Sequence, residues 1–471
     1  MYNPRSTDAT EFIDHDEILA TLDYAASNRS NIPLMLSILE KGARMQGLTH
    51  REALTLLECE DRDIIDATAD LARQIKQRFY GNRIVMFAPL YLSNYCVNGC
   101  VYCPYHSTNR VIARRKLTQE EIRREVIALQ DMGHKRLALE AGEHPTMNPI
   151  EYILESIDTI YSIRHRNGVI RRVNVNIAAT TVENYRKLRD AGIGTYILFQ
   201  ETYHKENYER LHPTGPKSDY RYHTEAMDRA MHGGIDDVGL GVLYGLNTYR
   251  YDFTGLLMHA RHLEEVYGVG PHTISVPRIC PADDINTSDF PDAISDDLFC
   301  RIIAVLRVAV PYTGMIVSTR ESAAVRAKAL EMGVSQISGG SRTSVGGYTD
   351  TSRDDDSAQF DISDRRTLDE VTSWLLDSGH IPSFCTACYR EGRTGDRFMS
   401  LVKTGNIARC CAPNALFTLK EYLEDYAGAD VKRKGLAAIE RELAALPDER
   451  IREITSRRLA EISAGKRDFR F

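Results

Sequence analysis

The chain contains 471 residues, of which 43% are hydrophobic and 27% are charged, and it carries a formal net charge of −7. This length can bury a barrel-sized core together with additional helical segments, and the composition is that of a soluble globular protein. The negative net charge argues against nucleic acid as the main partner. No apolar stretch approaches the length that spans a bilayer, so we expect no membrane partner either.

The start of the chain, residues 1–8, lacks the apolar segment of a secretory signal. The sequence nevertheless contains 10 cysteines. Without an export signal, this number favours a reducing compartment and metal or catalytic use over a disulfide framework. We therefore expect a cytoplasmic protein.

Residues 1–80 are predicted to form an N-terminal helical extension, with helix-periodic apolar residues at 18–25 and 52–57. An alternation of strands and helices follows. The apolar runs that we interpret as buried strands are Arg83–Pro89, Arg136–Glu140, Arg172–Ala178, Thr195–Glu201, Asp237–Tyr244, Thr273–Arg278, Met315–Arg320 and Gln336–Ser341. Eight such strands with helical crossovers favour a parallel (β/α)8 TIM-type barrel of the α/β class, which we assign to residues 81–350.

Short signals mark the ends of the connecting helices. Thr118 and Glu121 have the spacing of a capping box, and Thr180 with Glu183 repeats it, so helices should begin at these threonines. The glycines that end a helix shortly before a strand are Gly133, Gly192, Gly234 and Gly333. Each of them is expected to adopt the left-handed conformation that closes a helix.

Residues 351–471 are predicted to form a C-terminal helical segment. Helix-periodic runs at 419–426, 436–446 and 451–462 are rich in Lys, Arg and Glu, which indicates solvated helix faces. The sequence shows neither an internal repeat nor a low-complexity linker between this segment and the barrel.

A cysteine triad, Cys96, Cys100 and Cys103, follows the first predicted strand. A cubane iron–sulfur cluster takes four outside ligands, so three thiolates leave one iron open to a small molecule. The alternative is a structural zinc site, which normally has four nitrogen or sulfur ligands. The only imidazole near this triad is His106, so the spacing favours the cluster.

A second triad lies in the C-terminal segment. Cys385 and Cys388 form a CxxC pair, and either Cys411 or its neighbour Cys410 completes the set after a long gap. A CxxC pair by itself is typical of redox and zinc sites as well. We interpret this segment as the holder of a second iron–sulfur cluster.

Polar segments follow several of the predicted strands: 140–143, 200–204, 318–321 and 338–343. Each could by itself be a plain turn or a salt-bridged rim. The reactive groups of a parallel barrel lie on the loops after its strands, at one end of the barrel. These polar segments and the first triad should lie at the same end of the barrel, which predicts a functional site there.

The spacing of the first triad, with the aromatic Tyr102 just before the third cysteine, resembles the radical S-adenosylmethionine superfamily. The resemblance implies a 4Fe-4S cluster whose open iron binds S-adenosylmethionine. Ala141, Gly142 and Glu143 stand where that superfamily has a glycine-glycine-glutamate element, which holds the methionine amino group. Ala141 departs from the usual glycine, which is a small change for a contact made through the backbone.

The chain from about residue 80 to 415 is more closely similar to the tyrosine lyase of FeFe-hydrogenase maturation, a relative of the 2-iminoacetate synthase of thiamine biosynthesis. The segments that carry this resemblance are 91–98, 174–179, 200–204, 270–277, 385–390 and 395–399. It implies a radical carbon–carbon lyase that cleaves the Cα–Cβ bond of L-tyrosine to p-cresol and dehydroglycine. Dehydroglycine would yield carbon monoxide and cyanide, which build an iron–CO–cyanide synthon for the hydrogenase active site.

The resemblance also implies two 4Fe-4S clusters, the second with an additional labile iron and free cysteine as a candidate ligand of that iron. Cys411 fits the family's twenty-two-residue gap after Cys388. His272, just before the sixth strand, is the implied imidazole ligand of the labile iron, although a lone histidine beside a strand is more often structural. The implied partners are a hydrogenase maturation scaffold, other maturation proteins, and a reduced donor such as ferredoxin or flavodoxin.

Tyrosine is a zwitterion, and a guanidinium group suits its carboxylate. Arg320 is our candidate, with Ser318 and Ser341 as further donors; the alternative is a rim salt bridge from Arg320 to the adjacent glutamate, Glu321. Glu201 and Arg229 are candidates for the ribose or methionine ends of S-adenosylmethionine, although Arg229 could equally be a solvated helix residue.

Three other interpretations remain open at this stage. The 2-iminoacetate synthase cleaves the same bond, but it should lack the second cluster. A non-enzymatic iron–sulfur scaffold explains both triads but not the polar segments after the strands. A zinc-stabilised barrel with a different function is the third.

Overall fold

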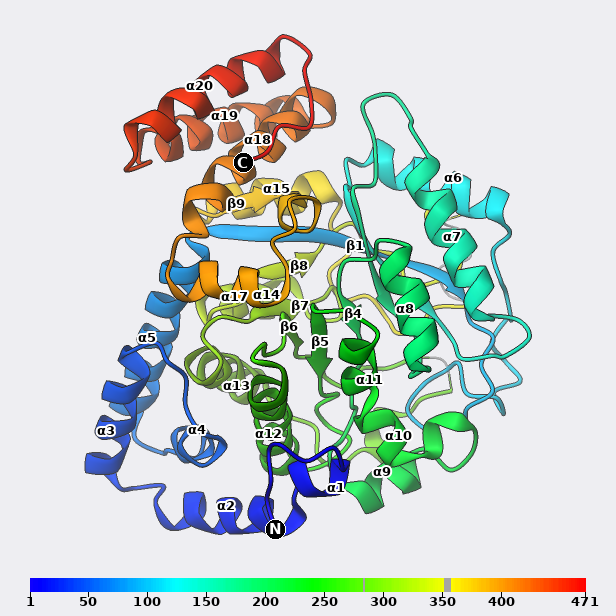
Figure 1. Ribbon diagram of the computed structural model, residues 1–471, viewed down its shortest axis with the longest axis vertical. Coiled ribbons are helices and arrows are strands. Elements are labelled where there is room, and N and C mark those ends of the chain that lie inside the picture. The colour runs from blue at the N-terminus through cyan, green and yellow to red at the C-terminus, as the bar shows by residue number, and fades with distance from the viewer. Residues whose placement is uncertain (283, 351–356) are drawn as a thin grey trace.

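The computed structural model describes residues 1–282, 284–350 and 357–471. Its strands are β1 (Arg83–Ser93), β2 (Arg136–Ala141), β3 (Arg172–Asn176), β4 (Tyr196–Ile197), β5 (Val238–Gly241), β6 (Thr273–Ser275), β7 (Gly314–Val317), β8 (Gln336–Ser338) and β9 (Ile381–Ser383). Strands β1 to β8 pair in parallel and in sequence order, and β1 pairs with both β8 and β2. The predicted (β/α)8 barrel is therefore confirmed, and Figure 1 shows it at the centre of the molecule.

The long strand β1 makes three contacts along its length. Residues 83–85 pair with β9, residues 85–87 pair with β8, and residues 88–93 pair with β2. Sequence analysis did not predict β9, because its three residues are too few to show a periodic pattern. This pairing attaches the C-terminal segment to the amino end of the first barrel strand.

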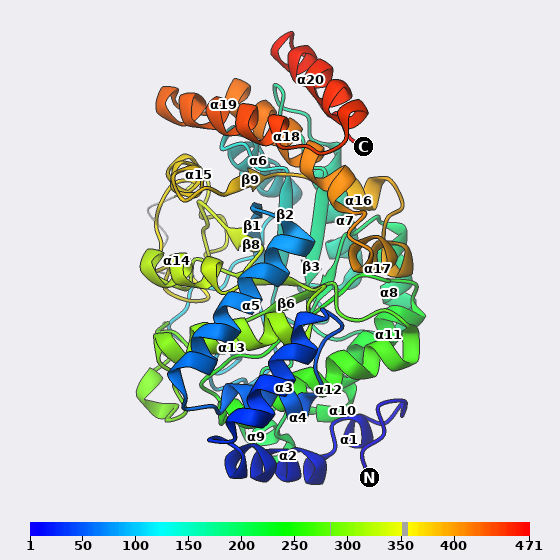
Figure 2. The same ribbon diagram turned by 90° about the vertical axis from the view of Figure 1, so that its left-hand side faces the viewer.

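The N-terminal extension is helical, as predicted. Its helices are α1 (Ala9–Phe12), α2 (His15–Ser27), α3 (Ile32–Ala43), α4 (His50–Leu57) and α5 (Arg62–Tyr80). Helix α5 packs against α13 of the barrel and leads directly into β1, as Figure 2 shows. The extension thus covers one side of the barrel at the end where the N-terminus lies (Figures 1 and 2).

Helices connect consecutive strands on the outside of the barrel. They are α6 (Gln119–Asp131), α7 (Ile150–Ser162), α8 (Val182–Asp190), α9 (Lys205–Leu211), α10 (Tyr220–Thr224), α11 (Ala226–His232), α12 (Tyr249–Tyr267), α13 (Asp296–Ala309) and α14 (Ala323–Glu331), with short 3-10 turns at Pro216–Ser218 and Thr287–Asp289. The predicted capping box of Thr118 and Glu121 is confirmed. The second helix start was wrong by one residue, because Thr181 caps the backbone N–H of Asn184.

The glycine signals are confirmed: Gly133, Gly192, Gly234 and Gly333 all have positive φ. Several strands are shorter than predicted, however. The run 195–201 contains only the two-residue β4, and the run 336–341 contains only β8. The remaining residues of both runs form loops after the strands, and these loops supply polar groups to the site described below.

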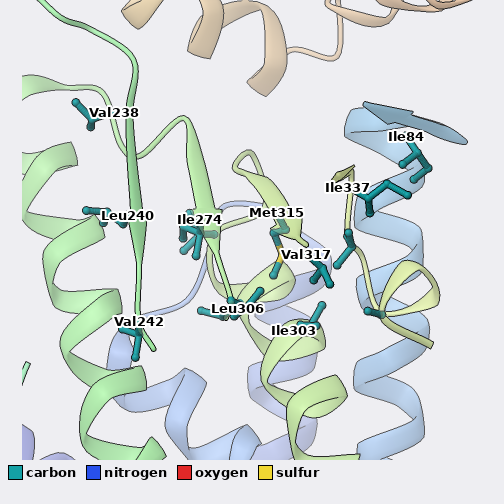
Figure 3. Packing of buried hydrophobic residues seen from close by; sticks show 14 of the residues in the cluster. Ile84, Val238, Leu240, Val242, Ile274, Ile303, Leu306, Met315, Val317 and Ile337 are labelled. Carbon is teal, nitrogen blue, oxygen red and sulfur yellow. The ribbon is translucent and has the colours of Figure 1, made fainter. Parts of the chain in front are cut away.

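The core between the strands and helices follows the two-residue period of the strands. Val238 and Leu240 of β5, with Val242 just after it, extend toward the helix layer, and Ile303 and Leu306 of α13 lie near Met315 and Val317 in the same cluster (Figure 3). The alternate residues of the strands, such as Gly239, Ser275 and Ser338, are small or polar. Small side chains there leave room for cavities within the barrel.

The C-terminal segment contains α15 (Leu368–Asp377), α16 (Ala387–Arg390), α17 (Gly395–Lys403), α18 (Ala408–Asp425), α19 (Ala429–Ala444) and α20 (Glu449–Ser463). The three predicted helical runs fall in α18, α19 and α20, which lie together at the end of the molecule opposite the N-terminus (Figures 1 and 2). The predicted boundary after residue 350 adjoins residues 351–356, which lie outside the described residues. Among the helices described here, none is both long enough and apolar enough to cross a membrane.

Candidate functional site

The first cysteine triad lines a cavity at the carboxyl ends of the barrel strands. The residues predicted for a site that line this cavity are Cys96, Cys100, Tyr102, Cys103, Ala141, Gly142, Glu143, Glu201 and Arg320. They come from the loops after β1, β2, β4 and β7, so the fold brings together residues that are more than 200 positions apart. We call this the first cavity.

Backbone contacts fix the loop that carries the first triad. Val97 N–H donates to the Glu143 carbonyl at 2.8 Å, and Val101 N–H donates to the Leu211 carbonyl at 3.0 Å. Burial raises the pKa of the Cys100 thiol to about 12, and it raises that of Cys103 still further. Buried thiols of this kind become thiolates when a metal supplies positive charge, so the donor set fits an iron–sulfur cluster.

Gly142 lies against the same loop at a distance that only glycine allows. A Cβ atom at this position would lie 2.5 Å from the Tyr95 carbonyl oxygen and 3.1 Å from the Cys96 Cβ atom. The next residue, Glu143, accepts a hydrogen bond of 2.7 Å from Asn98 Nδ2. Burial raises the pKa of Glu143. The predicted cofactor-binding element therefore packs directly on the first triad.

Glu201 has a strained backbone and a buried cation as its partner. Its φ of 69° is unusual for a residue with a side chain. Lys217 Nζ donates to its carboxylate at 2.8 Å, and both side chains are mostly buried. Asp252 accepts hydrogen bonds of 2.8 Å from the Thr202 hydroxyl and from Tyr203 N–H, which holds the loop immediately after Glu201.

Arg320 lines both the first cavity and an adjoining cavity inside the barrel, which Ser318 also lines. The alternative ion pair between Arg320 and Glu321 is wrong, because Glu321 pairs with Arg278. The guanidinium group of Arg320 instead packs over the Phe360 ring. Burial raises the pKa of Glu140 well above its usual value, which a hydrogen bond with Asn176 and the charge of Arg320 partly oppose.

Two predicted residues lie away from both cavities. Arg229 donates to the carbonyl oxygens of Thr180 and Tyr222, so its guanidinium group joins helices instead of entering the first cavity. Ser341 is buried, and its hydroxyl has no hydrogen-bond partner among the described residues, but it does not line either cavity. Cys280, which belongs to neither triad, is half-buried and also lines the first cavity.

The second triad lines another cavity at the amino ends of the strands, on the far side of the barrel from the first. Cys385, Cys388, Cys411 and His272 all line this second cavity. Cys385 follows β9, Cys388 lies in α16, and Cys411 lies in the first turn of α18. Cys410 does not belong to the lining, so the position of Cys411 agrees with the predicted ligand set.

His272 connects a buried carboxylate to the second cavity. Its Nδ1 atom lies 3.3 Å from Asp237 Oδ1, and its Nε2 atom lies 3.1 Å from the Tyr389 hydroxyl. Burial favours the neutral acid, but His272 and Arg172 outweigh it and lower the pKa of Asp237. A carboxylate on one ring nitrogen orients the other nitrogen toward a metal, as in many metal sites.

Within residues 1–282, 284–350 and 357–471, no three Cys, His, Asp or Glu side chains converge closely enough to hold one metal ion. A zinc ion needs its ligands within about 2.3 Å of one point. A cubane instead distributes its thiolate ligands around its corners. The described part of the chain therefore shows no preassembled site for a single metal ion.

Sequence analysis missed several residues that line the cavities. Arg83, Arg136 and Arg172 line the second cavity, and each is the first residue of a strand. The sequence contained a signal for these arginines, since three of the predicted strands begin with arginine. Lys217 lines the first cavity from the 3-10 turn Pro216–Ser218, and no sequence pattern marked it.

Comparisons with known proteins identify the class of this barrel. The Radical SAM superfamily model matches residues 90–253, and the model of the Biotin and Thiamin Synthesis associated domain matches residues 275–381. The fold and the first cavity therefore define a radical S-adenosylmethionine barrel protein.

Similarity to individual proteins narrows the class to a family. A crystal structure of HydG, a maturase of the FeFe-hydrogenase, is 54% identical, covers 98% of this chain and 100% of that chain, and has a TM-score of 0.95. HydG from Carboxydothermus hydrogenoformans is 36% identical over 96% of this chain and 99% of its own, with a TM-score of 0.82. The 2-iminoacetate synthase of Escherichia coli (strain K12) is 30% identical over 73% of this chain and 89% of its own. The chain belongs to the HydG family of FeFe-hydrogenase maturases.

Proposed function

We propose that this protein is a radical S-adenosylmethionine lyase that cleaves the Cα–Cβ bond of L-tyrosine to p-cresol and dehydroglycine. Dehydroglycine then yields carbon monoxide and cyanide for an iron–CO–cyanide product that serves the FeFe-hydrogenase active site. The observation that carries this proposal is the pair of thiol-lined cavities at opposite ends of one barrel.

Cys96, Cys100 and Cys103 are the proposed ligands of the first 4Fe-4S cluster. When bound, this cluster and S-adenosylmethionine supply a 5′-deoxyadenosyl radical, and that chemistry belongs to the cofactors. Glu143 accepts hydrogen bonds in the first cavity, which suits the methionine amino group. The ion pair of Glu201 and Lys217 offers a further polar contact for the same ligand.

Arg320 is the proposed clamp for the tyrosine carboxylate. Among the described residues its guanidinium group forms no ion pair, and it lines both the first cavity and the adjoining one inside the barrel. A planar guanidinium group binds a carboxylate through two parallel hydrogen bonds, so it fixes orientation as well as position. Ser318 lines the adjoining cavity and offers another donor. Such a clamp would hold the amino group of tyrosine at the first cavity.

Cys385, Cys388 and Cys411 are the proposed ligands of the second cluster, and His272 is the proposed ligand of the additional labile iron. Asp237 on Nδ1 leaves Nε2 of His272 to face the second cavity, where Tyr389 now lies next to it. Free cysteine is a candidate ligand of the same iron. The proposed partners are a maturation scaffold, other maturation proteins and a reduced electron donor such as ferredoxin or flavodoxin.

The competing function is that of 2-iminoacetate synthase, which cleaves the same bond. Identity to a HydG structure over 98% of the chain, against 73% for the Escherichia coli synthase, favours the maturase. The second triad lies at residues 385–411, beyond the matched Biotin and Thiamin Synthesis associated domain, which ends at residue 381. This additional cluster site is the feature that supports the maturase over the synthase.

The test is anaerobic reconstitution with iron and sulfide, followed by incubation with S-adenosylmethionine, a reductant and tyrosine. We expect about eight irons per chain, because each cubane holds four, and we expect p-cresol and bound carbon monoxide and cyanide among the products. About four irons with p-cresol but no carbon monoxide or cyanide would favour the synthase. Eight irons without deoxyadenosine would favour a non-enzymatic scaffold.

A further inference from the structure

Three arginines that neither the cluster ligands nor the tyrosine clamp accounts for line the second cavity. Arg83, Arg136 and Arg172 begin β1, β2 and β3, so the amino ends of three adjacent strands direct them to the same place. Arg136 is 7% exposed and Arg172 is 3% exposed. The second cavity therefore contains buried positive charge next to its three thiols.

The hydrogen-bond partners of these guanidinium groups are neutral. Arg83 donates to the Tyr80 carbonyl at 2.7 Å, and Arg136 donates to the Cys385 carbonyl at 2.9 Å. Arg172 donates to the Asn174 side chain at 2.8 Å. The Nε atom of Arg136 is buried and has no partner among the described residues. Hydrogen bonds thus orient the groups without neutralising their charge.

The cavity lining provides no counter-charge for them. Among the described residues, no Asp or Glu lines the second cavity; the nearby Asp237 lies 3.3 Å from His272 and also interacts with Arg172, so one carboxylate lies close to this group of three arginines. A buried charge is expensive unless an opposite charge compensates for it. The arrangement therefore points to an anionic occupant.

The first cavity has a more balanced lining. Its two cations, Lys217 and Arg320, are accompanied by the carboxylates Glu143 and Glu201, while burial favours the neutral form of Glu140. The two cysteine triads thus lie in surroundings of different net charge. Net charge and hydrogen bonding are among the properties that set the reduction potential of an iron–sulfur cluster.

We propose that Arg83, Arg136 and Arg172 are positioning residues that compensate the negative charge of the second cluster and hold its reduction potential above that of the first. Each thiolate ligand adds a negative charge, and reduction of the cluster adds another. Three nearby guanidinium groups stabilise the more negative, reduced form more than the oxidised form. The inference rests on the second cluster of the proposed function, but not on tyrosine as the substrate.

The test is a redox titration of the second cluster, followed by electron paramagnetic resonance, in the full-length chain with Cys96, Cys100 and Cys103 all replaced by Ala. In this background only the second triad can hold a cluster. We expect Arg136→Met to lower the ratio of reduced to oxidised cluster at least tenfold at a fixed potential, a shift of about 59 mV for one electron. Arg136→Lys, which keeps the charge, should shift the ratio much less.

Arg390→Met is the matched control. Arg390 lies two residues after Cys388, but it pairs with Asp468 at 2.5 Å and does not line the second cavity. Its removal should leave the potential unchanged. The parallel variants Arg172→Met and Arg172→Lys repeat the comparison at a second position.

Iron and sulfide analysis separates the outcomes. If the methionine variants lose the cluster while the lysine variants keep it, the positive charge is needed and the proposal is supported. If methionine and lysine variants behave alike, or if the potential does not change although the cluster is retained, the arginines do not act through charge and the inference is wrong. If the parent chain binds no second cluster at all, the proposed function itself fails.

Discussion

The two cavities of this barrel are built in different ways. The first lies at the carboxyl ends of the strands, and loops of very different length bring its cysteines together with Gly142, Glu201 and Arg320. The second lies at the amino ends, where three strands begin with arginine and a short added strand, β9, brings in Cys385. Loops supply the side chains that would contact S-adenosylmethionine and substrate, whereas regular strand starts supply charge. One barrel can thus offer two chemically distinct environments for similar cysteine triads.

The largest effect is expected from a substitution that disables the first cavity and leaves the second intact. Replacing Cys100 with Ala removes one of three thiolates, so the cluster that generates the radical should be lost. We expect both deoxyadenosine and p-cresol to fall to background in chromatographic assays. The second cluster should remain, with about four irons per chain, since each cubane holds four. Substantial tyrosine cleavage by this variant would show that the first triad has another role.

The next effect separates the two ends of the barrel. Cys388→Ser should remove the second cluster and with it the iron-bound carbon monoxide and cyanide, which infrared spectroscopy detects. Formation of p-cresol should continue, because the first cavity lies at the opposite end of the strands. If p-cresol decreases as severely as it does in Cys100→Ala, the two cavities do not divide the reaction in this way.

A moderate effect is expected from Arg320→Lys in the first cavity. Lysine keeps the positive charge but replaces a planar fork with a point charge. Loss of one charge-assisted hydrogen bond corresponds to about 1.5–3 kcal/mol, so tyrosine affinity or coupling should fall roughly tenfold or more. Deoxyadenosine should still form, and the ratio of p-cresol to deoxyadenosine measures the uncoupling. Unchanged coupling and affinity would mean that another residue binds the carboxylate.

The smallest effect on product formation is expected from two buried aspartates near opposite ends of the barrel. They act on the pH dependence of stability. Burial raises the pKa of Asp252, beside the first cavity, from 3.8 to about 7. Burial acts in the same direction on Asp237, beside the second cavity, but His272 and Arg172 outweigh it and lower the pKa of Asp237. A raised carboxyl pKa means that the folded state binds more protons than the unfolded state between about pH 4 and 7. The contribution of Asp252 to stability therefore falls as the pH rises through this range, by up to about 4 kcal/mol.

Asp252→Asn should remove this dependence, since the amide oxygen can still accept from Thr202 and Tyr203. We expect denaturant unfolding of the variant to lose less stability than the wild type between pH 5 and 7. Asp237 should behave in the opposite way, because a lowered pKa stabilises the folded state above pH 4 and loses that contribution on acidification. Parallel pH profiles for wild type and Asp252→Asn would show that Asp252 does not titrate in this range.

Much of the site was accessible from local sequence. The spacing of Cys96, Cys100 and Cys103 specifies a loop that can surround a cluster, and this information lies within eight residues. Glycines such as Gly133 and Gly192 mark helix ends because their left-handed conformation is a local property of the backbone. The barrel followed from the alternation of apolar runs, since each buried strand has a recognisable composition.

Other features were decided only by the tertiary structure. Arg229 was a reasonable candidate for the first cavity, but packing between helices directs it to the Thr180 carbonyl. Glu321 is adjacent to Arg320 in sequence, yet it pairs with Arg278, which lies more than 40 positions away. Cys410 and Cys411 are neighbours, and only the direction of the first turn of α18 distinguishes them.

The physical reason is the range over which each property acts. Strand composition, helix caps and the cysteine spacings depend on a few neighbouring residues, so the sequence alone determined the barrel, its helices, the first cysteine triad and the CxxC pair of the second. The direction of a side chain and the charge around it depend on contacts between distant segments. Only the assembled barrel therefore decided that the arginines of β1, β2 and β3 line the cavity of one triad, while acidic residues from β2 and from the loops after β2 and β4 line the cavity of the other.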